Sequence, residues 1–356
     1  MSLPRLLLVY EPEEACIDRL VALGFPTRHA IEVASYLAQS TDMAPHLEPL
    51  AAACAARGIM FQSVALDEAP TVLAAADPAK DIVWTLTDGI AYFRGGVAPA
   101  LARLHGLQCI GADDSLFALC QDKFRSGAVL SALNLPVPAA GLAQDGVWIV
   151  PPPPSTRGWF VKPNRLGAKI GIWTDSHCHD PAQALELSQR VYAAYRDAVI
   201  VQPYVPGRNV RASYLDLTGR QDMADLGVTF VNSDSDFQTM ADSMSLYGAT
   251  GAAEREAGTY REPELVPVAR LQPAADARVR EIAARLVAGL GLREVFSLDL
   301  RIEADGTVHL IEFEVCPGLP CFDFVRYCRD HWALPLAEAM AATCHARLSS
   351  SGRTKY

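Results

Sequence analysis

The sequence has no excess of basic residues, no long apolar run and no paired spacing among its cysteines. Its 31 Lys and Arg against 41 Asp and Glu give a net charge of −10, whereas sequence-independent nucleic-acid binding requires a basic face. The apolar run at residues 6–9 soon meets Glu11, so we expect neither a signal peptide nor a membrane span, which needs ~20 apolar residues. The nine cysteines are odd in number and scattered, which is typical of reduced thiols in a cytoplasmic protein.

The length of 356 residues, of which 50% are apolar and 20% charged, indicates a globular chain of two or three domains. Residues 5 to about 112 alternate predicted strands and helices, which favours a small parallel sheet with both faces covered. The strands are expected at residues 5–10, 60–66, 81–86 and 108–111. Ligand groups gather beyond the carboxyl ends of such strands, where the polar residues are Glu11, Glu13, Glu14, Thr87 and Asp88. Taken singly, each of these acids is better explained by a surface loop.

The rest of the chain is predicted to mix helices with further strands. One helix is expected over residues 114–133. It must end there because Pro136 and Pro138 forbid its continuation. Strands are expected at residues 158–163, 170–173, 198–202 and 210–217, and helices at 181–195 and 274–290, the second capped by Gly291. The polar residues 234–259 are predicted to form a loop, and residues 350–356 a disordered tail.

A hairpin near the C-terminus carries the strongest local signal. Asp305-Gly306 lies between two alternately apolar runs, which predicts a tight hairpin turn. With those two residues as the loop, Ala304 faces Thr307, and counting outward pairs Asp299 with Glu312 and Ser297 with Glu314. Because side chains alternate between the faces of a strand, these four point to one side. The opposite face is apolar and consists of Leu298, Leu300, Ile311 and Phe313.

The carboxylates on this hairpin predict a metal site. Two directly opposed carboxylates repel each other unless a cation lies between them. Ligand sets made only of oxygen favour Mg²⁺, with Mn²⁺ as an alternative, so we expect Asp299, Glu312 and Glu314 to hold magnesium. The competing interpretation is a solvated acidic face.

Two lysines could supply positive charge to a polyphosphate. Lys162 closes a predicted strand and precedes a glycine-containing basic segment, residues 164–171, that includes Lys169. An ammonium beside exposed backbone N–H groups suits phosphate oxygens. Lys123 could add a second ammonium if its helix packs nearby.

These patterns follow one another in a fixed order along the chain. They are Asp122-Lys123, Val161-Lys162-Pro163, Pro203-Tyr204-Val205-x-Gly207, Asp299-x-Arg301 and Glu312-x-Glu314-Val315-x-Pro317-Gly318. The series resembles the ATP-grasp superfamily, and within it the D-alanine–D-alanine ligase-like branch. The resemblance runs from about Asp113 to Leu319.

The resemblance implies an α/β (α+β) ATP-grasp fold behind an N-terminal parallel-sheet domain. Residues 1–112 would form that substrate-binding domain, 113–200 the central ATP-grasp subdomain, and 201–349 the C-terminal subdomain with the metal site. Lys123 and Lys162 would contact the ATP phosphates, and residues 164–171 would close over them. The adenine hinge would be formed by Gln202, Pro203, Tyr204 and Val205.

Several positions depart from the pattern that this branch shows. Gln202 stands where the hinge has an acid, Asn209 where a Glu contacts ribose, and Glu314 where the third metal ligand is commonly Asn. Ala168-Lys169 replaces the paired serines of the phosphate loop. The first domain lacks the Gly-Gly…Ser…Glu signature, and Thr87-Asp88-Gly89 replaces a His-Gly. ATP binding is therefore better supported than D-alanine as the substrate.

A missing arginine raises the question of what stabilises the reacting centre. The branch has an arginine two residues before the first metal ligand, where this chain has Ser297. Arg301 is expected on the same strand face as Ser297 and Asp299, and we predict catalytic roles for Arg301, Lys162 and Ser297. Arg208 and Arg211 are the alternatives to Arg301.

The predicted function is that of an ADP-forming carboxylate–amine ligase. We further expect the protein to be cytoplasmic and to form a homodimer. ATP would phosphorylate a small carboxylate, and an amine, as of an amino acid, would then attack the acyl phosphate. A specialised natural-product pathway is favoured. The alternatives are a kinase that stops at a phosphorylated product and an ATP-binding protein that has lost catalysis.

Overall fold

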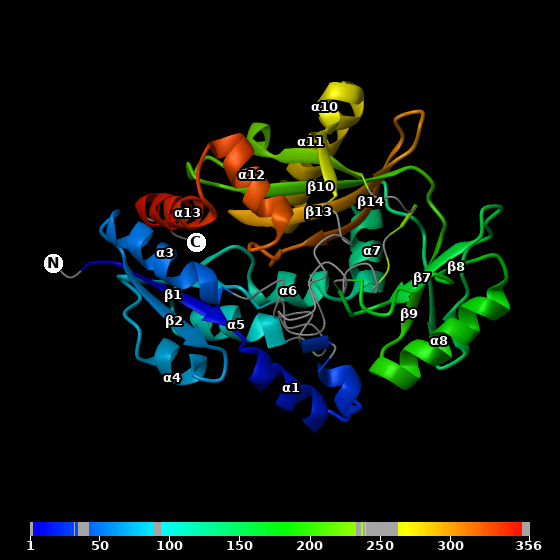
Figure 1. The fold of residues 1–356 in the computed structure, drawn as a ribbon, viewed down its shortest axis with the longest axis horizontal. Coiled ribbons are helices and arrows are strands. Elements are labelled where there is room, and N and C mark those ends of the chain that lie inside the picture. The colour runs from blue at the N-terminus through cyan, green and yellow to red at the C-terminus, as the bar shows by residue number, and fades with distance from the viewer. Residues whose placement is uncertain are drawn as a thin grey trace, which may run out of the picture.

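The computed structural model describes residues 3–31, 33–34, 43–87, 94–167, 169–232, 236–237, 239 and 263–350. Figure 1 shows three lobes, each built on its own sheet. The first sheet is parallel, in the order β2-β1-β3-β4. Its strands are β1 (Arg5–Tyr10), β2 (Met60–Ala65), β3 (Asp81–Thr85) and β4 (Gln108–Ile110), which confirms the predicted parallel sheet. The helices of this lobe are α1 (Glu13–Ala22), α3 (Ala44–Ala55), α4 (Ala69–Ala74) and α5 (Val97–Leu104), with a 3₁₀ turn at Arg94–Gly96.

The second sheet is antiparallel, in the order β6-β5-β9-β7-β8. It consists of β5 (Gly141–Gln144), β6 (Val147–Val150), β7 (Trp159–Pro163), β8 (His177–Cys178) and β9 (Val199–Pro203), with α8 (Pro181–Tyr195) packed on it. The predicted strand at residues 170–173 is wrong, since β8 is the strand that returns beside β7. Lys169 and Gly171 have φ of 65° and 72°, a left-handed conformation that interrupts extended backbone.

The third sheet is also antiparallel, in the order β12-β11-β10-β13-β14. Its strands are β10 (Arg208–Leu215), β11 (Gly227–Asn232), β12 (Glu264–Pro267), β13 (Val295–Ile302) and β14 (Val308–Glu314). The helices around it are α10 (Val268–Leu271), α11 (Pro273–Leu290), α12 (Phe322–Trp332) and α13 (Leu336–Ser350), and a 3₁₀ turn covers Met223–Asp225. The helix expected before Gly291 is confirmed as α11, and Gly291 has the left-handed φ of 76° expected of a C-terminal cap.

The single helix predicted over residues 114–133 is wrong, because the chain forms two helices there. They are α6 (Asp114–Cys120) and α7 (Lys123–Ala132). Asp122 between them is extended (φ −109°, ψ 98°), and its carboxylate accepts a hydrogen bond from the backbone N–H of Arg125, as an N-cap does. Lys123 is thereby the first residue of a helix. Leu116 on α6 and Leu130 on α7 pack into the core of the third sheet.

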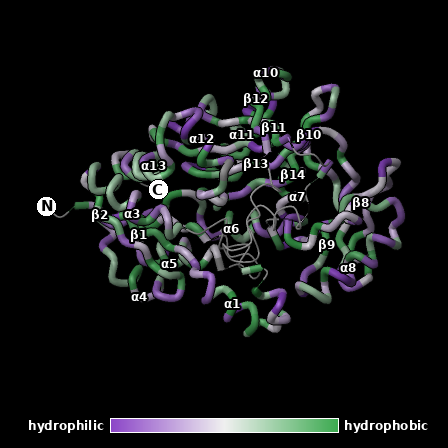
Figure 2. The backbone as a smooth tube through the Cα atoms, viewed as in Figure 1, coloured by the Kyte–Doolittle hydropathy of each residue, from purple (hydrophilic) through white to green (hydrophobic). Residues whose placement is uncertain are grey.

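The last two helices return the chain to the first lobe. In Figure 1, α13 lies beside α3, and Leu50 and Cys54 share one buried cluster with Met340 and Cys344. In Figure 2, parts of both helices are green, the colour of hydrophobic residues. Ser350, which was expected to begin the tail, is instead the last residue of α13. Residues 351–356 and most of the predicted loop at 234–259 lie outside the described residues.

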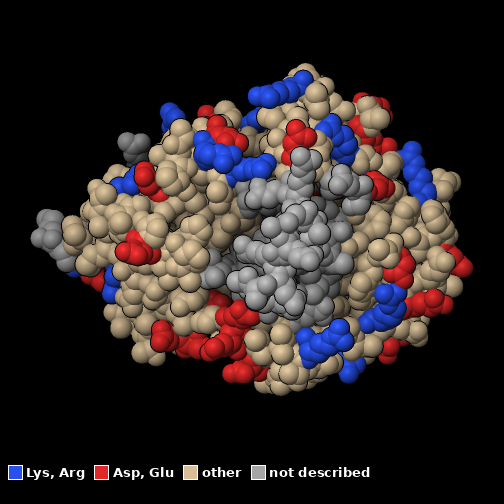
Figure 3. All heavy atoms as spheres, viewed as in Figure 1, with Lys and Arg blue, Asp and Glu red and all other residues tan. Residues whose placement is uncertain are grey.

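The surface visible in Figure 3 carries charged side chains of both signs. On the face shown in Figure 3, basic and acidic side chains are interspersed, and acidic side chains gather at the lower edge. Among the described residues, no helix is long and apolar enough to cross a membrane.

In the C-terminal hairpin, the strand pairs distant from the turn are those predicted, but the turn differs from the predicted one. Ser297 pairs with Glu314 and Asp299 with Glu312, as predicted. The two-residue turn is wrong: Glu303 bonds to Thr307 across the loop, and Gly306 takes φ of +89°, so the loop has three residues. A bulge after Asp299 pairs Leu300 with Leu310 and cancels the extra loop residue.

The bulge exchanges two residues between the faces of β14. Leu310 is fully buried in the core, whereas Ile311, predicted to face the core, lines the cavity on the other side. Leu310→Ala should therefore lower the free energy of unfolding by about 2–5 kcal/mol, the range for a large-to-small core substitution. Ile311→Ala, the matched control on the next residue, should cost much less. Urea unfolding of both variants measures this difference, and the reverse order would contradict the observed register.

Candidate active site

A cavity of about 360 Å³ lies between the second and third sheets. The lobe that carries β7 and β9 forms one wall, and β10, β13 and β14 form the other (Figure 1). Most residues singled out in the sequence line it: Lys123, Lys162, Lys169, Gln202, Pro203, Tyr204, Val205, Asn209, Asp299, Arg301, Glu312 and Glu314. Segments from distant parts of the chain therefore place the predicted nucleotide and metal residues around one space.

The three hairpin carboxylates converge at this cavity. Asp299, Glu312 and Glu314 each offer one oxygen, and these atoms lie within 4.8 Å of one another. The three side chains are half-buried, between 24% and 38% exposed. Clustered carboxylate oxygens with room for water fit Mg²⁺ or Mn²⁺. The residues present thus suit the metal that the fold implies.

Two lysines face this cluster from the second sheet and from α7. Lys162 is buried, and its Nζ donates to Glu312 Oε2 at 3.1 Å; the Nζ of Lys123 lies 3.7 Å from the same oxygen. Burial lowers the pKa of Lys162, against the attraction of Glu312. Burial alone would raise the pKa of Glu312, but Lys162 and Lys123 lower it to about 2. Glu312 is therefore ionised at neutral pH and tied to both ammonium groups.

Asp299 and Arg211 form the opposite end of the cluster. Burial raises the pKa of Asp299, against the nearby guanidinium of Arg211, and the negative charges of Glu314 and Glu312 raise it further. Burial alone would lower the pKa of Arg211, but Asp299, Glu314 and Asp323 raise it well above its usual value. Positive charge thus borders the carboxylates on both sides.

The loop after Lys162 is fixed to the start of α7. The backbone N–H of Lys123 donates to the carbonyl of Asn164, and the Asn164 side chain accepts from Phe124 N–H and donates to Asp122. Lys123 Nζ also donates to the Leu166 carbonyl at 2.7 Å. The sequence placed Asp122 and Asn164 beside the two lysines, but it did not report their hydrogen bonds, which set the position of Lys123.

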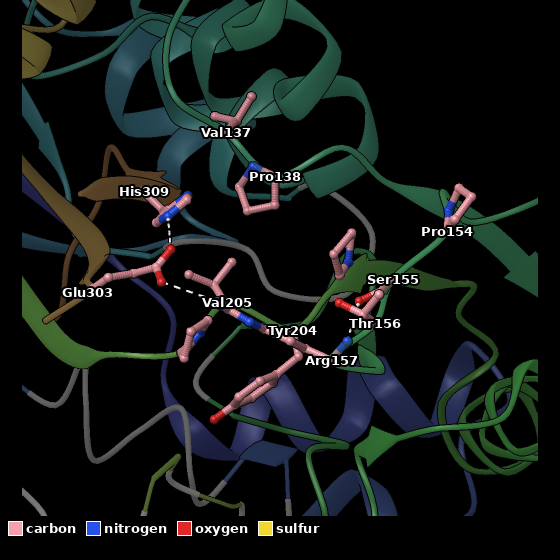
Figure 4. Close-up of a pocket in the computed structure, with 12 residues that line it drawn as sticks. Val137, Pro138, Pro154, Ser155, Thr156, Arg157, Tyr204, Val205, Glu303 and His309 are labelled. Atoms are coloured by element: carbon pink, nitrogen blue, oxygen red, sulfur yellow. Dashed lines mark hydrogen bonds and ion pairs between the residues drawn. The ribbon is translucent and has the colours of Figure 1, made fainter. Parts of the chain in front are cut away.

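The predicted hinge separates this cavity from a second groove. Pro203, Tyr204 and Val205 border both, and Gln202 Nε2 donates to the Pro138 carbonyl at 3.3 Å. Figure 4 shows the groove, about 590 Å³ in volume, with Glu303 turned toward His309. Glu303 Oε1 lies 2.9 Å from His309 Nε2, and its other oxygen accepts from Arg157 at 3.2 Å. The hairpin is thereby tied to the segment before β7.

Arg301 lines the cavity, as predicted, but its hydrogen bonds are made away from the carboxylate cluster. Its guanidinium donates to the Gly207 carbonyl at 2.6 Å, to Asn209 Oδ1 at 3.2 Å, and to both the carbonyl and Oδ1 of Asp236. The hydroxyl of Tyr204 bonds to the same Asp236 carboxylate. Arg301 therefore holds the chain after β11 against the hinge. Its predicted catalytic role remains a prediction.

Arg301→Ala should weaken nucleotide binding more than it slows turnover. The substitution removes the bonds to Asp236 and Asn209, and so loosens the wall on the hinge side. We expect the KM for ATP to rise about tenfold, as for the loss of one or two bonds to a charged group, with kcat within a few-fold of the wild type. Arg278→Ala, which removes an exposed arginine paired with Glu281, is the control. A loss of kcat at unchanged KM would instead support the catalytic role.

The other predicted residues have varied surroundings. Ser297 is fully buried, and its hydroxyl donates to Glu314 Oε2 at 2.7 Å. Arg208 reaches the other face of β10, over the ring of Phe230, and bonds to Asn232. In the first lobe, Glu11 accepts two hydrogen bonds from Arg19, Thr87 is buried, and Asp88 lies outside the described residues.

Comparison with known proteins shows that the chain is similar to D-alanine ligases. No family model matches the sequence. A putative D-alanine–D-lactate ligase of Streptomyces coelicolor is 27% identical over 266 residues, 72% of this chain and 70% of that protein. A D-alanine–D-alanine ligase of a Caulobacter strain is 29% identical over 162 residues, 41% of this chain and 47% of that protein.

Solved structures share the fold over nearly the whole chain. The D-alanine–D-alanine ligase of Bacillus anthracis complexed with ATP superposes with a TM-score of 0.63 at 15% identity, covering 99% of both chains. A D-cycloserine synthetase superposes with a TM-score of 0.56 at 17% identity, covering 97% of this chain and 99% of that one. The predicted ATP-grasp fold and the resemblance to the D-alanine–D-alanine ligase-like branch are confirmed. The names of these relatives also agree with the predicted class, an ATP-grasp ligase.

Proposed function

We propose that the protein is an ADP-forming ligase that joins a small carboxylate to the amine of an amino acid. The observation that carries the proposal is the junction at Glu312, where Lys162 and Lys123 meet a cluster of carboxylates inside the cavity between two sheets. Ammonium groups suit the phosphates of ATP, and the carboxylates suit divalent metal. We also propose that the domains meet at residues 112 and 200. The hinge is proposed to bind the adenine of ATP.

The reaction would take place in two steps. A carboxylate oxygen of the substrate attacks the γ-phosphorus of ATP, the bond to the bridging oxygen breaks, and ADP leaves. The amine nitrogen then attacks the acyl carbon of the acyl phosphate, and the C–O bond breaks to release inorganic phosphate as the nitrogen loses a proton. Lys162 and Lys123 would hold the phosphates in line.

Asp299, Glu312 and Glu314 would hold the magnesium, which offsets negative charge on the phosphate oxygens. Manganese is an alternative with the same ligand preference. The fixed loop from Asn164 and the wall at Asp236 would limit access of water, which otherwise hydrolyses an acyl phosphate.

The substrate is proposed to differ from that of cell-wall ligases. The similar proteins are named D-alanine–D-lactate ligase, D-alanine–D-alanine ligase and D-cycloserine synthetase, so their names differ in the compounds they mention. In this chain, the third metal ligand is Glu314 and the phosphate loop has Lys169. These departures favour a specialised, natural-product pathway. A cytoplasmic location and a homodimer remain predictions.

The test measures ADP release with ATP and magnesium in three mixtures: a panel of small carboxylates alone, amino acids alone, and both together. We expect ADP release to require both, with formation of an amide. ADP formation with the acid alone, and no amide product with any amine, would favour a kinase. ATP binding without turnover in any mixture would favour a protein that has lost catalysis.

A further inference from the structure

Arg211 reaches the cavity from β10 and contacts three different carboxylates. Its Nη1 donates to Asp299 Oδ1 at 2.9 Å, its Nη2 to Glu314 Oε2 at 2.7 Å, and its Nε to Asp323 Oδ2 at 2.9 Å. The side chain is 16% exposed. Because each of the three guanidinium nitrogens donates to a different carboxylate, the orientation of the planar group is fixed.

Strand pairing brings this guanidinium to the space above Ser297. In the β10–β13 register, Arg211 stands opposite Asp299 and Ser213 opposite Ser297. The Ser297 hydroxyl and Arg211 Nη2 donate to the same oxygen, Glu314 Oε2, each at 2.7 Å. A small residue at 297 leaves room for the arginine of the neighbouring strand, and a long side chain there would compete for the same place.

Asp323 is the contact that is not part of the carboxylate cluster. It lies in the first turn of α12, is 8% exposed, and does not belong to the set of acids that could share a metal ion. It binds Nε at the base of the guanidinium, and the Nη groups are left toward Asp299 and Glu314. Asp323 therefore sets the direction in which the guanidinium points.

The cavity thus carries cations at both ends of its carboxylates. Lys162 and Lys123 meet Glu312 at one end, and Arg211 meets Asp299 and Glu314 at the other. A phosphoryl group held between these ends would have donors on two sides. The lysines are point charges, whereas the guanidinium offers two parallel donors.

We propose that Arg211 is the catalytic guanidinium of this site and that Asp323 is its positioning residue. The inference rests on the proposed ligase function. During transfer, the Nη groups donate hydrogen bonds to the transferring phosphoryl oxygens. When the amine attacks, the electron pair of the acyl C=O bond moves onto oxygen, and the same groups stabilise that oxyanion until the C–O bond to phosphate breaks. Arg211 keeps its protons throughout.

The first test compares turnover of Arg211→Lys, Arg211→Ala and Asp323→Asn with that of Arg208→Lys, whose parent arginine lies on the other face of β10. Both Arg211 variants should lose a factor of ~100–1000 in kcat, as when an oxyanion donor is removed, with the KM for ATP raised by no more than about tenfold. Asp323→Asn should lose about tenfold in kcat, because the donor remains but is held less firmly. Added guanidinium should partly restore Arg211→Ala. Wild-type kcat in Arg211→Lys and Arg211→Ala would overturn the proposal.

The second test does not depend on turnover. Arg211 at the phosphoryl position should favour a non-hydrolysable ATP analogue over ADP, so Arg211→Ala and Arg211→Lys should lower that preference about tenfold at saturating magnesium. Arg208→Lys should leave it unchanged. If the wild-type protein forms no amide, the proposed function fails, and this ratio still decides the role of Arg211. An unchanged ratio in both Arg211 variants would overturn it.

A transposed variant separates catalysis from folding. Arg211→Ser combined with Ser297→Arg returns a guanidinium to Glu314 from the neighbouring strand. We expect the double variant to recover at least tenfold over Arg211→Ser, as charge-assisted bonds are restored. Thermal unfolding of all variants checks that they fold. A folded double variant that recovers neither kcat nor analogue preference would count against a shared position for the two side chains.

Discussion

Glu312→Gln should lower kcat for ADP release by a factor of ~100–1000, the range for losing electrostatic stabilisation in a preorganised site. Glu312 is shared by Lys162, by Lys123 and by the candidate metal cluster. The amide keeps the shape of the side chain and removes its charge, which leaves two ammonium groups without that partner and the metal with one anionic ligand fewer. Asp299→Asn should act in the same direction.

The measurement is kcat over a magnesium titration for both variants. Glu281→Gln is the matched control, since it makes the same chemical change at an exposed acid on α11 that pairs with Arg278. We expect the control to match the wild type. Near-normal rates for both Glu312→Gln and Asp299→Asn at saturating magnesium would remove the metal-site assignment.

Lys162→Met should reduce kcat/KM for ATP by at least ~100-fold, because it deletes a buried ammonium that lines the cavity between the second and third sheets. Methionine fills a similar volume in the wall of β7, so the fold should be kept. Lys123 remains 3.7 Å from Glu312, and its ammonium still offsets that carboxylate.

Binding of a fluorescent ATP analogue and steady-state kinetics together measure this effect, with Lys80→Met as control. Lys80 pairs with Asp77 at an exposed site in the first lobe, and its loss should change neither quantity. If Lys162→Met bound and turned over ATP as the wild type does, the lysine would have no part in nucleotide recognition.

Local patterns in the sequence predicted many elements at or near their observed bounds. Short apolar runs located β1 and β3, alternation of apolar residues located β13, and Gly291 marked the end of α11. The turn at Asp305-Gly306 was placed correctly, but its length was wrong. The three-residue loop and the bulge shift the register by equal and opposite amounts. The pairing of Asp299 with Glu312 was therefore predicted despite the wrong turn.

The errors have a common physical origin in backbone features that periodicity does not report. Asp122 divides a helix because its side chain caps the next one, and Lys169 and Gly171 end an expected strand with left-handed conformations. A bulge moves Ile311 to the cavity and Leu310 to the core. Each depends on one or two residues, whereas hydrophobic patterns average over many.

Local spacing was enough to predict which residues share the hairpin face and in what order the lysines and acids follow along the chain. Which cationic side chains contact the hairpin carboxylates depends on the tertiary structure. Strand order sets β10 beside β13 and so places Arg211 opposite Asp299, and the return of α12 brings Asp323 to the same guanidinium. Arg301 is much nearer to Asp299 in sequence than Arg211 is, but its guanidinium donates to Asp236 and Gly207 instead. Pairing between distant strands depends on the whole core, which no local pattern contains.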